Sequence, residues 1–240
     1  MDDHELAAAL AAEAGHLLLG VRAEGGDDLM ARGDRTSNDL LMARLAELRP
    51  ADGVLSEESV DDKSRLDTSR VWIVDPLDGT REFGEPPRVD WAVHVALTVD
   101  GAPVVGAVAL PSLDVVLSTA QPPVLPPPVD APPRLAVSRT RPPACTQVLV
   151  DALGATLVEM GSAGAKAMAV VRGEVDVYAH SGGQYEWDSC APVAVAAAAG
   201  LHVSRLDGSP LVYNQPDPYL PDLLICRPEL ATLVLEALNT

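Results

Sequence analysis

The N-terminal part of the chain carries the pattern of two amphipathic helices. Apolar residues recur every three or four positions over 6–21, and Asp2 and Glu5 stand before them at the spacing of a capping box. A polar stretch over 31–39 predicts a loop. A second helical pattern follows this stretch and ends before Pro50. Each pattern predicts a helix that packs one apolar face against a core.

Short apolar runs predict strands in the rest of the chain. The run 71–74 is apolar throughout, which is typical of a strand buried on both faces. Two further runs, 91–99 and 104–110, flank Asp100-Gly101, a dipeptide that favours a tight hairpin. From residue 135 onward, strands alternate with helices, and this order predicts a second sheet covered by helices. The chain is therefore predicted to be an α/β protein.

Proline marks one boundary in this order of elements. The segment 121–133 holds seven prolines in thirteen residues, a composition typical of a spacer and not of a helix or strand. We therefore predict an N-terminal α+β subdomain over 1–121, a Pro-rich linker over 122–133 and a C-terminal α/β subdomain over 134–240.

A formal net charge of −18 restricts the partners of the protein. Proteins that bind nucleic acid or anionic membranes present a basic face, so neither partner is expected. Cys145, Cys190 and Cys226 are far apart in the sequence, which predicts buried thiols in a reducing cytoplasm. No apolar run reaches the roughly 20 residues that span a bilayer, and the N-terminus lacks a signal pattern. We therefore expect a cytoplasmic protein.

The segment Asp75–Thr80, with the sequence DPLDGT, stands where the buried strand must end. Pro76 lacks a backbone donor and Gly79 allows backbone angles closed to other residues, so the chain is predicted to turn here. The two carboxylates repel each other unless a cation lies between them, and oxygen ligands favour Mg²⁺, Ca²⁺ or Mn²⁺. A solvated turn with two exposed aspartates is the alternative for a bare pair of this spacing.

The whole hexapeptide, preceded by an apolar strand, resembles the signature of the inositol monophosphatase superfamily. Members of this superfamily are Mg²⁺-dependent, lithium-sensitive phosphomonoesterases. The upstream segment Ser56–Ser59 and the downstream segment Glu186–Asp188 match in order and spacing. The resemblance implies an α/β (α+β) protein with the layered αβαβα sandwich of the inositol monophosphatase and fructose-1,6-bisphosphatase type.

The resemblance also implies a site for two or three Mg²⁺ ions. Glu57, Asp75 and the backbone oxygen of Leu77 are expected to hold one ion, and Asp75 is expected to bridge to the next, with Asp78 and Asp188 as the further ligands. Asp188 stands where the N-cap of a predicted helix over 190–199 belongs, and capping and coordination are compatible.

The same resemblance assigns the residues that orient the attacking water. Thr80 and Glu57 are expected to do so, together with Asp39, because Thr36 to Asp39 has the family's Thr-x-x-Asp form. The alternative for 37–39 is the cap of the second helix. Whether Asp39 takes part in catalysis stays open at this point.

The C-terminal half resembles the 3′-phosphoadenosine-5′-phosphate phosphatases of CysQ type within the superfamily. Residues 138–141 resemble their Ser-Arg-x-His segment, with Arg141 in place of His. Gly161-Ser162 with Lys166 resembles their turn at which a helix N-terminus and a lysine ammonium group bind the second phosphate. Inositol enzymes carry a Glu seven residues before the last metal Asp, where this chain has Ser181. The resemblance implies these substrate-binding residues: Asp78, Gly79, Thr80, Ser138, Arg139, Arg141, Ser162, Lys166 and Asp188.

The sequence thus predicts a Mg²⁺-dependent enzyme that hydrolyses the 3′-phosphate of 3′-phosphoadenosine-5′-phosphate, and of its 5′-phosphosulfate relative, in sulfur assimilation. An inositol-1-phosphate or fructose-1,6-bisphosphate phosphatase is the alternative within the superfamily. A catalytically retired protein that binds a phosphate ligand is the alternative outside enzymes, although such a protein has no reason to keep mutually repelling acids. The expected partner is a small phosphate ester, and a homodimer stays open.

Overall fold

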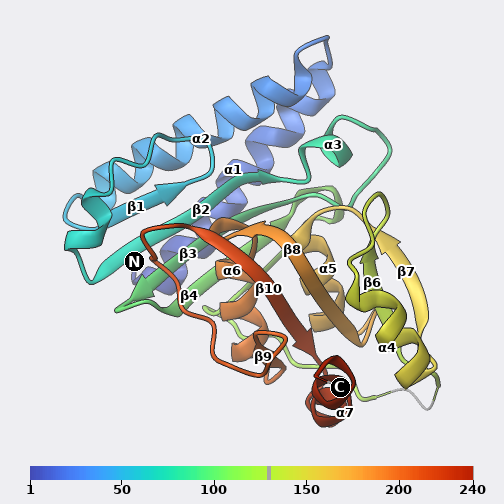
Figure 1. Cartoon of the computed structure of the whole chain (residues 1–240). Helices are drawn as coiled ribbons and strands as arrows, with labels where there is room; N and C mark the ends of the chain where they lie inside the picture. The colour runs from blue at the N-terminus through green and yellow to red at the C-terminus, as the bar shows by residue number, and fades with distance from the viewer. Residues whose placement is uncertain (129–130, 240) are drawn as a thin grey trace.

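The computed structural model describes residues 1–128 and 131–239, and its strands form two five-stranded sheets (Figure 1). The first sheet contains, in spatial order, β1 (Gly53–Ser56), β2 (Arg70–Asp78), β3 (Ala92–Val99), β4 (Ala102–Leu110) and β5 (Val115–Ser118). The second contains, in spatial order, β7 (Thr156–Met160), β6 (Arg134–Ser138), β8 (Val177–Tyr185), β10 (Tyr219–Cys226) and β9 (His202–Ser204). Both sheets are mixed, with β1 and β2 parallel in the first and β6 parallel to β7 and β8 in the second.

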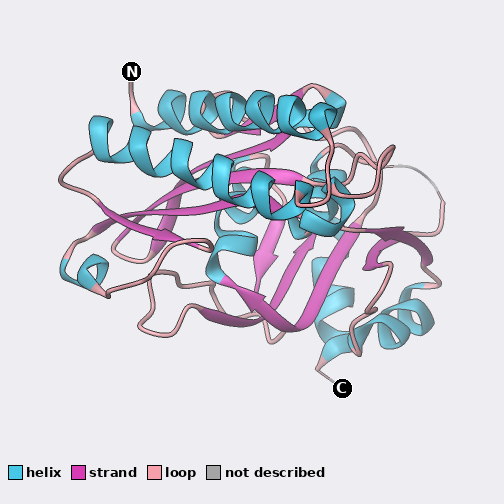
Figure 2. Cartoon of the chain, turned by 90° about the horizontal axis from the view of Figure 1, so that it is seen from above, coloured by secondary structure: helices cyan, strands magenta, loops and turns pink. Residues whose placement is uncertain are grey.

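Helices lie outside and between the two sheets. The described residues form α1 (Asp3–Glu24), α2 (Leu29–Leu48), α3 (Thr80–Phe83), α4 (Cys145–Leu153), α5 (Ala163–Val171), α6 (Glu186–Ala198) and α7 (Ala231–Leu238). α1 and α2 run side by side over the first sheet (Figure 2), α5 and α6 lie between the sheets, and α4 and α7 pack together beside the second sheet. This order of layers is the predicted αβαβα sandwich.

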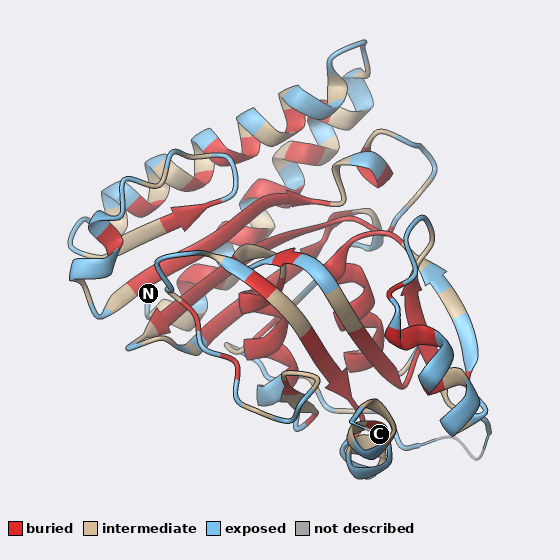
Figure 3. Ribbon diagram, viewed as in Figure 1, coloured by how far each residue is buried: buried red, intermediate tan, exposed pale blue. Residues whose placement is uncertain are grey.

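The core between the sheets consists largely of Ala, Val, Leu and Ile residues, and the elements that hold it are buried along most of their length (Figure 3). One buried cluster joins Ile73 and Val108 of the first sheet to Val170 of α5 and Ile225 of the second. α6 lies very close to β4, because a Cβ added at Gly106 would meet the Ala194 Cβ at 2.7 Å. The division into two subdomains at 122–133 stays a prediction. The three cysteines are buried and free, as predicted.

The second helix begins earlier than its apolar pattern indicates. α2 includes all of 31–39, which the polar composition predicted to be a loop. Packing explains the difference, because a Cβ at Gly33 would lie 2.8 Å from the Phe83 Cε1 and 2.9 Å from the Leu77 Cδ2. The start of α2 is therefore determined by its contact with the chain that follows β2, which no local pattern can show.

α1 is the one described helix whose length and composition would let it cross a membrane, at 22 residues. The helix uses its apolar face in another way, since Leu6, Leu10 and Leu18 are buried in a cluster with Val93 and Val105 of the first sheet. This packing is typical of a core helix of a globular protein.

Candidate active site

The ends of two parallel strands place the first acidic residues at one edge of the first sheet. β1 and β2 run parallel with Ser56 opposite Val74, so the chain leaves both strands at the same edge. Glu57 follows β1 directly, and Asp75 follows Val74 on β2. The register with β3 is irregular between Asp75 and Asp78, which interrupts the pairing where the DPLDGT segment lies.

The chain turns directly after β2, as predicted. Gly79 has a φ of 84°, in the left-handed region that favours glycine. Space is also short at this position, because a Cβ there would lie 3.0 Å from the Ser162 Cβ. The Ser37 hydroxyl donates a hydrogen bond of 2.7 Å to the Pro76 carbonyl and so ties the turn to α2.

α6 brings the last acidic residue to the same point. The helix begins at Glu186 and not at Cys190, so Asp188 lies in its first turn and is not the N-cap. Its carboxylate instead accepts a hydrogen bond of 2.7 Å from the backbone N–H of Tyr185, the residue that precedes the helix. Carboxylate oxygens of Asp75, Asp78 and Asp188 lie within 4.8 Å of one another. Three of the four predicted acids, from two distant segments, thus meet.

These acids repel one another when no cation lies between them. Burial and the charge of Glu57 hold the pKa of Asp75 well above its ordinary value. Burial and the charge of Asp78 raise the pKa of Asp188 to about 6. Glu57 is exposed at the rim of the site, but its carboxyl end lies against Asp75, and desolvation there and the charge of Asp188 raise its pKa to about 7.

Asp78 differs from the other acids because it has its own hydrogen-bond donors. Burial alone would raise its pKa, but the His94 ring and the Ser162 hydroxyl lower the pKa to about 2. The Nε2 of His94 lies 3.2 Å from the Asp78 Oδ2, and its Nδ1 donates to the Trp187 carbonyl at 3.0 Å. The backbone N–H of Gly164 donates to the same Oδ2 at 2.6 Å. His94 and the first turn of α5 therefore hold Asp78 in place.

The donor set of the cluster fits a hard divalent cation. Carboxylate and carbonyl oxygens are the ligands of Mg²⁺ and Ca²⁺, and raised pKa values indicate acids whose ionisation a bound cation would favour. Leu77 lies between Asp75 and Asp78 on β2, and its carbonyl accepts a hydrogen bond of 3.1 Å from the Thr80 hydroxyl. Asp75, Asp78 and Asp188, with Glu57 at the rim, would therefore hold metal ions here.

The Thr80 hydroxyl contacts Asp34, whereas Asp39, the candidate from the sequence whose role was left open, lies elsewhere on α2. The Thr80 Oγ1 lies 3.1 Å from the Asp34 Oδ1, whereas Asp39 is exposed on α2. Because α2 is helical here, residue 39 lies about 140° around the helix axis from residue 34. Burial and the charge of Glu58 raise the pKa of Asp34 to about 6. Asp34 therefore takes the position beside Thr80 that the Thr-x-x-Asp form assigned to Asp39.

We expect Asp34→Asn to lower kcat by about 10–100-fold, because the neutral amide no longer holds the Thr80 hydroxyl as a carboxylate does. Asp39→Asn is the matched control, since it removes the same charge from the same helix at an exposed position. The measurement is steady-state phosphate release by both variants. Equal losses in the two variants would show that the Asp34 contact has no special role.

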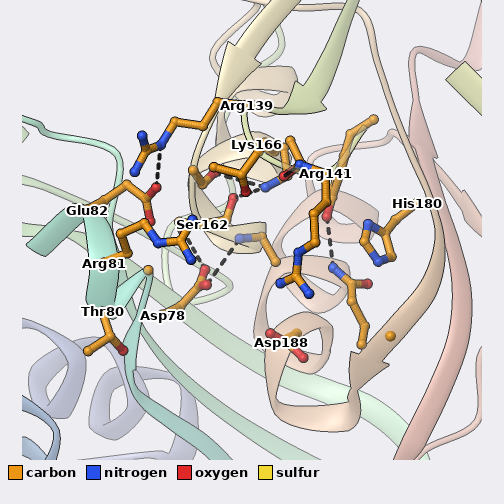
Figure 4. Close-up of a pocket in the computed structure, with 18 residues that line it drawn as sticks. Asp78, Thr80, Arg81, Glu82, Arg139, Arg141, Ser162, Lys166, His180 and Asp188 are labelled. Carbon is orange, nitrogen blue, oxygen red and sulfur yellow. Dashed lines mark hydrogen bonds and ion pairs between the residues drawn. The ribbon is translucent and has the colours of Figure 1, made fainter. Parts of the chain in front are cut away.

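One cavity of about 270 Å³ adjoins the acids (Figure 4). All the residues that the sequence proposed for substrate binding contribute to its wall: Asp78, Gly79, Thr80, Ser138, Arg139, Arg141, Ser162, Lys166 and Asp188. The structure thus brings segments of both sheets and of α3, α5 and α6 to one place. Their assigned roles in substrate binding stay predictions.

Two of the basic residues in this wall are engaged by the protein itself. Arg139 donates to Glu82 at 2.7 Å and to Glu85 at 2.8 Å, which links the second half of the chain to α3. The buried Lys166 ammonium donates to the carbonyls of Gly161 and Ser162. Burial lowers the pKa of Lys166. Only part of the hydrogen-bonding capacity of these two residues is left for a ligand.

Several residues of this site were not predicted from the sequence. His94 is a polar residue inside an apolar strand pattern, and that interruption was a usable signal. Arg81 directly follows the DPLDGT segment and lines the cavity. Asp34 and Glu82 carried no signal, since their positions depend on the packing of α2 and α3 against the turn after β2.

A model of the inositol monophosphatase family matches residues 4–122 and 134–240. The chain belongs to this family. The interruption between the two matched segments falls in the Pro-rich stretch. Family members are typically metal-dependent, which agrees with the acidic cluster. The family match confirms the resemblance on which the sequence prediction rested.

Curated relatives of this chain have the names of nucleotide phosphatases. The chain is 55% identical over 242 residues to the 3′-phosphoadenosine 5′-phosphate phosphatases of Mycobacterium bovis and Mycobacterium tuberculosis, covering 94% of this chain and 89% of each relative. It is 32% identical over 198 residues to the 3′(2′),5′-bisphosphate nucleotidase CysQ of Escherichia coli K12, covering 78% and 80%. The solved structure of CysQ from Bacteroides thetaiotaomicron matches with a TM-score of 0.79 and 25% identity, covering 94% of this chain and 97% of that one.

Proposed function

We propose that this protein is a Mg²⁺-dependent phosphatase that removes the 3′-phosphate of 3′-phosphoadenosine 5′-phosphate, and of its 5′-phosphosulfate relative, in sulfur assimilation. The observation that carries the proposal is one cavity whose wall holds two acids of the cluster, Asp78 and Asp188, together with Arg141, whose guanidinium has no acidic partner among the described residues. The names of the relatives that share more than half of its residues support the same substrate.

The acidic cluster would serve the phosphate that is hydrolysed. Mg²⁺ bound by Glu57, Asp75, Asp78, Asp188 and the Leu77 carbonyl would acidify a water molecule and stabilise negative charge on the phosphate and the leaving oxygen. The proposed site holds two or three Mg²⁺ ions.

The protein's own groups position the reactants. The Thr80 hydroxyl, held by Asp34, and the Glu57 carboxylate orient the attacking water. The backbone N–H groups of Gly79 and Thr80, at the start of the turn after β2, face the phosphate oxygens. The water oxygen bonds to phosphorus and the water gives up one proton to solvent, while the bond from phosphorus to the 3′-oxygen breaks and that oxygen leaves with a proton from solvent. No bond forms between phosphorus and the protein.

The phosphate that is not hydrolysed needs a cationic partner in a protein of net charge −18. Arg141 is exposed at the cavity wall, and its guanidinium has no hydrogen bond or ion pair within the described part of the chain. Ser138 lies beside it, its hydroxyl accepting a hydrogen bond of 3.2 Å from the Arg141 backbone. In the inositol enzymes a carboxylate contacts the sugar alcohol, and Ser181 supplies none at the corresponding position.

A substrate comparison at fixed Mg²⁺ tests this proposal. We expect kcat/KM for 3′-phosphoadenosine 5′-phosphate to exceed that for inositol 1-phosphate and fructose 1,6-bisphosphate by at least about tenfold, since one charged hydrogen bond contributes about 1.5–3 kcal/mol. A higher kcat/KM for either sugar phosphate would refute the nucleotide and leave the phosphatase. No hydrolysis of any of the three would favour the phosphate-binding regulator.

A cytoplasmic location and a homodimer stay predictions.

A further inference from the structure

Unpaired arginines are rare in this protein. The chain has fifteen arginines and more than twice as many acids, 35 in all. Within the described residues, all but three of the arginine side chains donate to a carboxylate or a carbonyl, as Arg22 and Arg139 do. The three without such a contact are Arg35, Arg81 and Arg141. Arg81 and Arg141 both line the cavity, whereas Arg35 lies on α2 outside its wall.

Arg81 has an anchored backbone and a free side chain. The preceding Thr80 is held through its hydroxyl by Asp34. The following Glu82 is buried and paired with Arg139, and its carbonyl accepts a hydrogen bond of 3.0 Å from Arg22. Arg81 itself is exposed. A guanidinium on a fixed backbone, with no partner among the described residues, keeps all of its donors available for a ligand.

The position of Arg81 indicates which ligand group it would meet. It directly follows Thr80 at the metal-facing turn, and Figure 4 shows Arg81 and Arg141 on opposite sides of Asp78. Guanidinium groups bind phosphate through two parallel hydrogen bonds. We propose that Arg81 is a substrate-binding residue that holds the phosphate to be hydrolysed, while Arg141 holds the other one. This inference rests on the proposed function, and nothing in the family comparison assigns Arg81 a role.

Assays with two nucleotide substrates distinguish the roles of Arg81 and Arg141. Arg81→Ala should lower kcat/KM for adenosine 3′,5′-bisphosphate and for adenosine 3′-monophosphate by the same factor, about 10–100-fold. Arg141→Ala should lower kcat/KM for the bisphosphate by a similar factor and leave that for the monophosphate within about twofold. Arg35→Ala, the matched control, should match the wild type on both substrates. Arg81→Lys should restore part of the loss, because lysine keeps the charge without the paired donors.

Binding of inorganic phosphate distinguishes a substrate-binding role of Arg81 from a purely structural one. With Mg²⁺ present, phosphate should inhibit Arg81→Ala about 10–100-fold more weakly than the wild type, while the melting temperature stays unchanged because the side chain has no partner to lose. Wild-type kcat/KM in Arg81→Ala, or a loss confined to the bisphosphate, would overturn the inference. If the wild type hydrolyses neither nucleotide, the proposed function is wrong. The role of Arg81 is then tested by phosphate binding alone, and unaltered phosphate binding by Arg81→Ala would overturn the inference.

Discussion

Asp188→Asn should lower kcat by about 10²–10³-fold or more while leaving the protein folded. Asp188 is the clearest of the acids to substitute, because an Asn oxygen can still accept the hydrogen bond from Tyr185 that orders the start of α6. The amide cannot replace the charge that a metal ligand supplies. Calorimetric titration with Mg²⁺ should show weaker binding in parallel with the loss of turnover. Wild-type turnover in this variant would exclude Asp188 from the metal site.

The same substitution should stabilise the metal-free protein at alkaline pH. Because the pKa of Asp188 is raised from 3.8 to about 6, its contribution to stability is present below pH 3.8 and is lost as the pH rises through about 6. At pH 8 without metal the ionised carboxylate opposes folding, so its removal should stabilise the fold by about 1–3 kcal/mol. Thermal unfolding in chelator at pH 8 should show the gain, and the gain should shrink at pH 5. A lower melting temperature at pH 8 would contradict the repulsion described here.

Gly164→Ala should destabilise the protein by about 2–4 kcal/mol. A Cβ at this position would lie 2.0 Å from the Nε2 of His94, a ring with no exposed surface in β3. The ring would have to move, which breaks its contacts with Asp78 and the Trp187 carbonyl and leaves buried polar groups without partners. Thermal unfolding measures the loss, and metal affinity should fall with it because Asp78 is displaced.

Two further variants make the Gly164 test specific. Gly20→Ala changes another helical glycine, with no heavy atom within 4 Å of the added Cβ, and should stabilise α1 by about 0.5–1 kcal/mol. His94→Ala removes the ring that the new methyl group meets, so the double variant should be less destabilised than the sum of the single changes. Additive effects would show that the clash with His94 is not the cause.

The resemblance to the inositol monophosphatase superfamily implied the convergence of the acids, and local patterns by themselves placed only Asp75 and Asp78 together at a turn. The apolar run before Asp75 predicted a buried strand, and Pro76 and Gly79 predicted the turn that follows it. The alternation of strands and helices predicted from residue 135 onward is also found, as in the helix Cys145–Leu153 and the strand Thr156–Met160 that follows it. Local patterns were sufficient wherever a segment's own residues decide its structure.

Contacts between distant segments explain what the sequence could not show. Residues 31–39 have no apolar stripe, and they are helical because Gly33 and Ser37 pack on the turn after β2. The same helix sends Asp39 to solvent and Asp34 to Thr80. The prediction for Arg139 considered only its charge, whereas the structure pairs it with Glu82 and Glu85. Composition identifies basic residues, but only the fold shows which of them are free.

Phosphate release from 3′-phosphoadenosine 5′-phosphate by chelator-treated protein, with and without added Mg²⁺, is the decisive measurement for a metal-dependent nucleotide phosphatase. We expect no release without a divalent cation, full activity once Mg²⁺ is restored, and AMP with its 5′-phosphate intact as the product. Release of phosphate by the metal-free protein, or a product that has lost the 5′-phosphate, would contradict it.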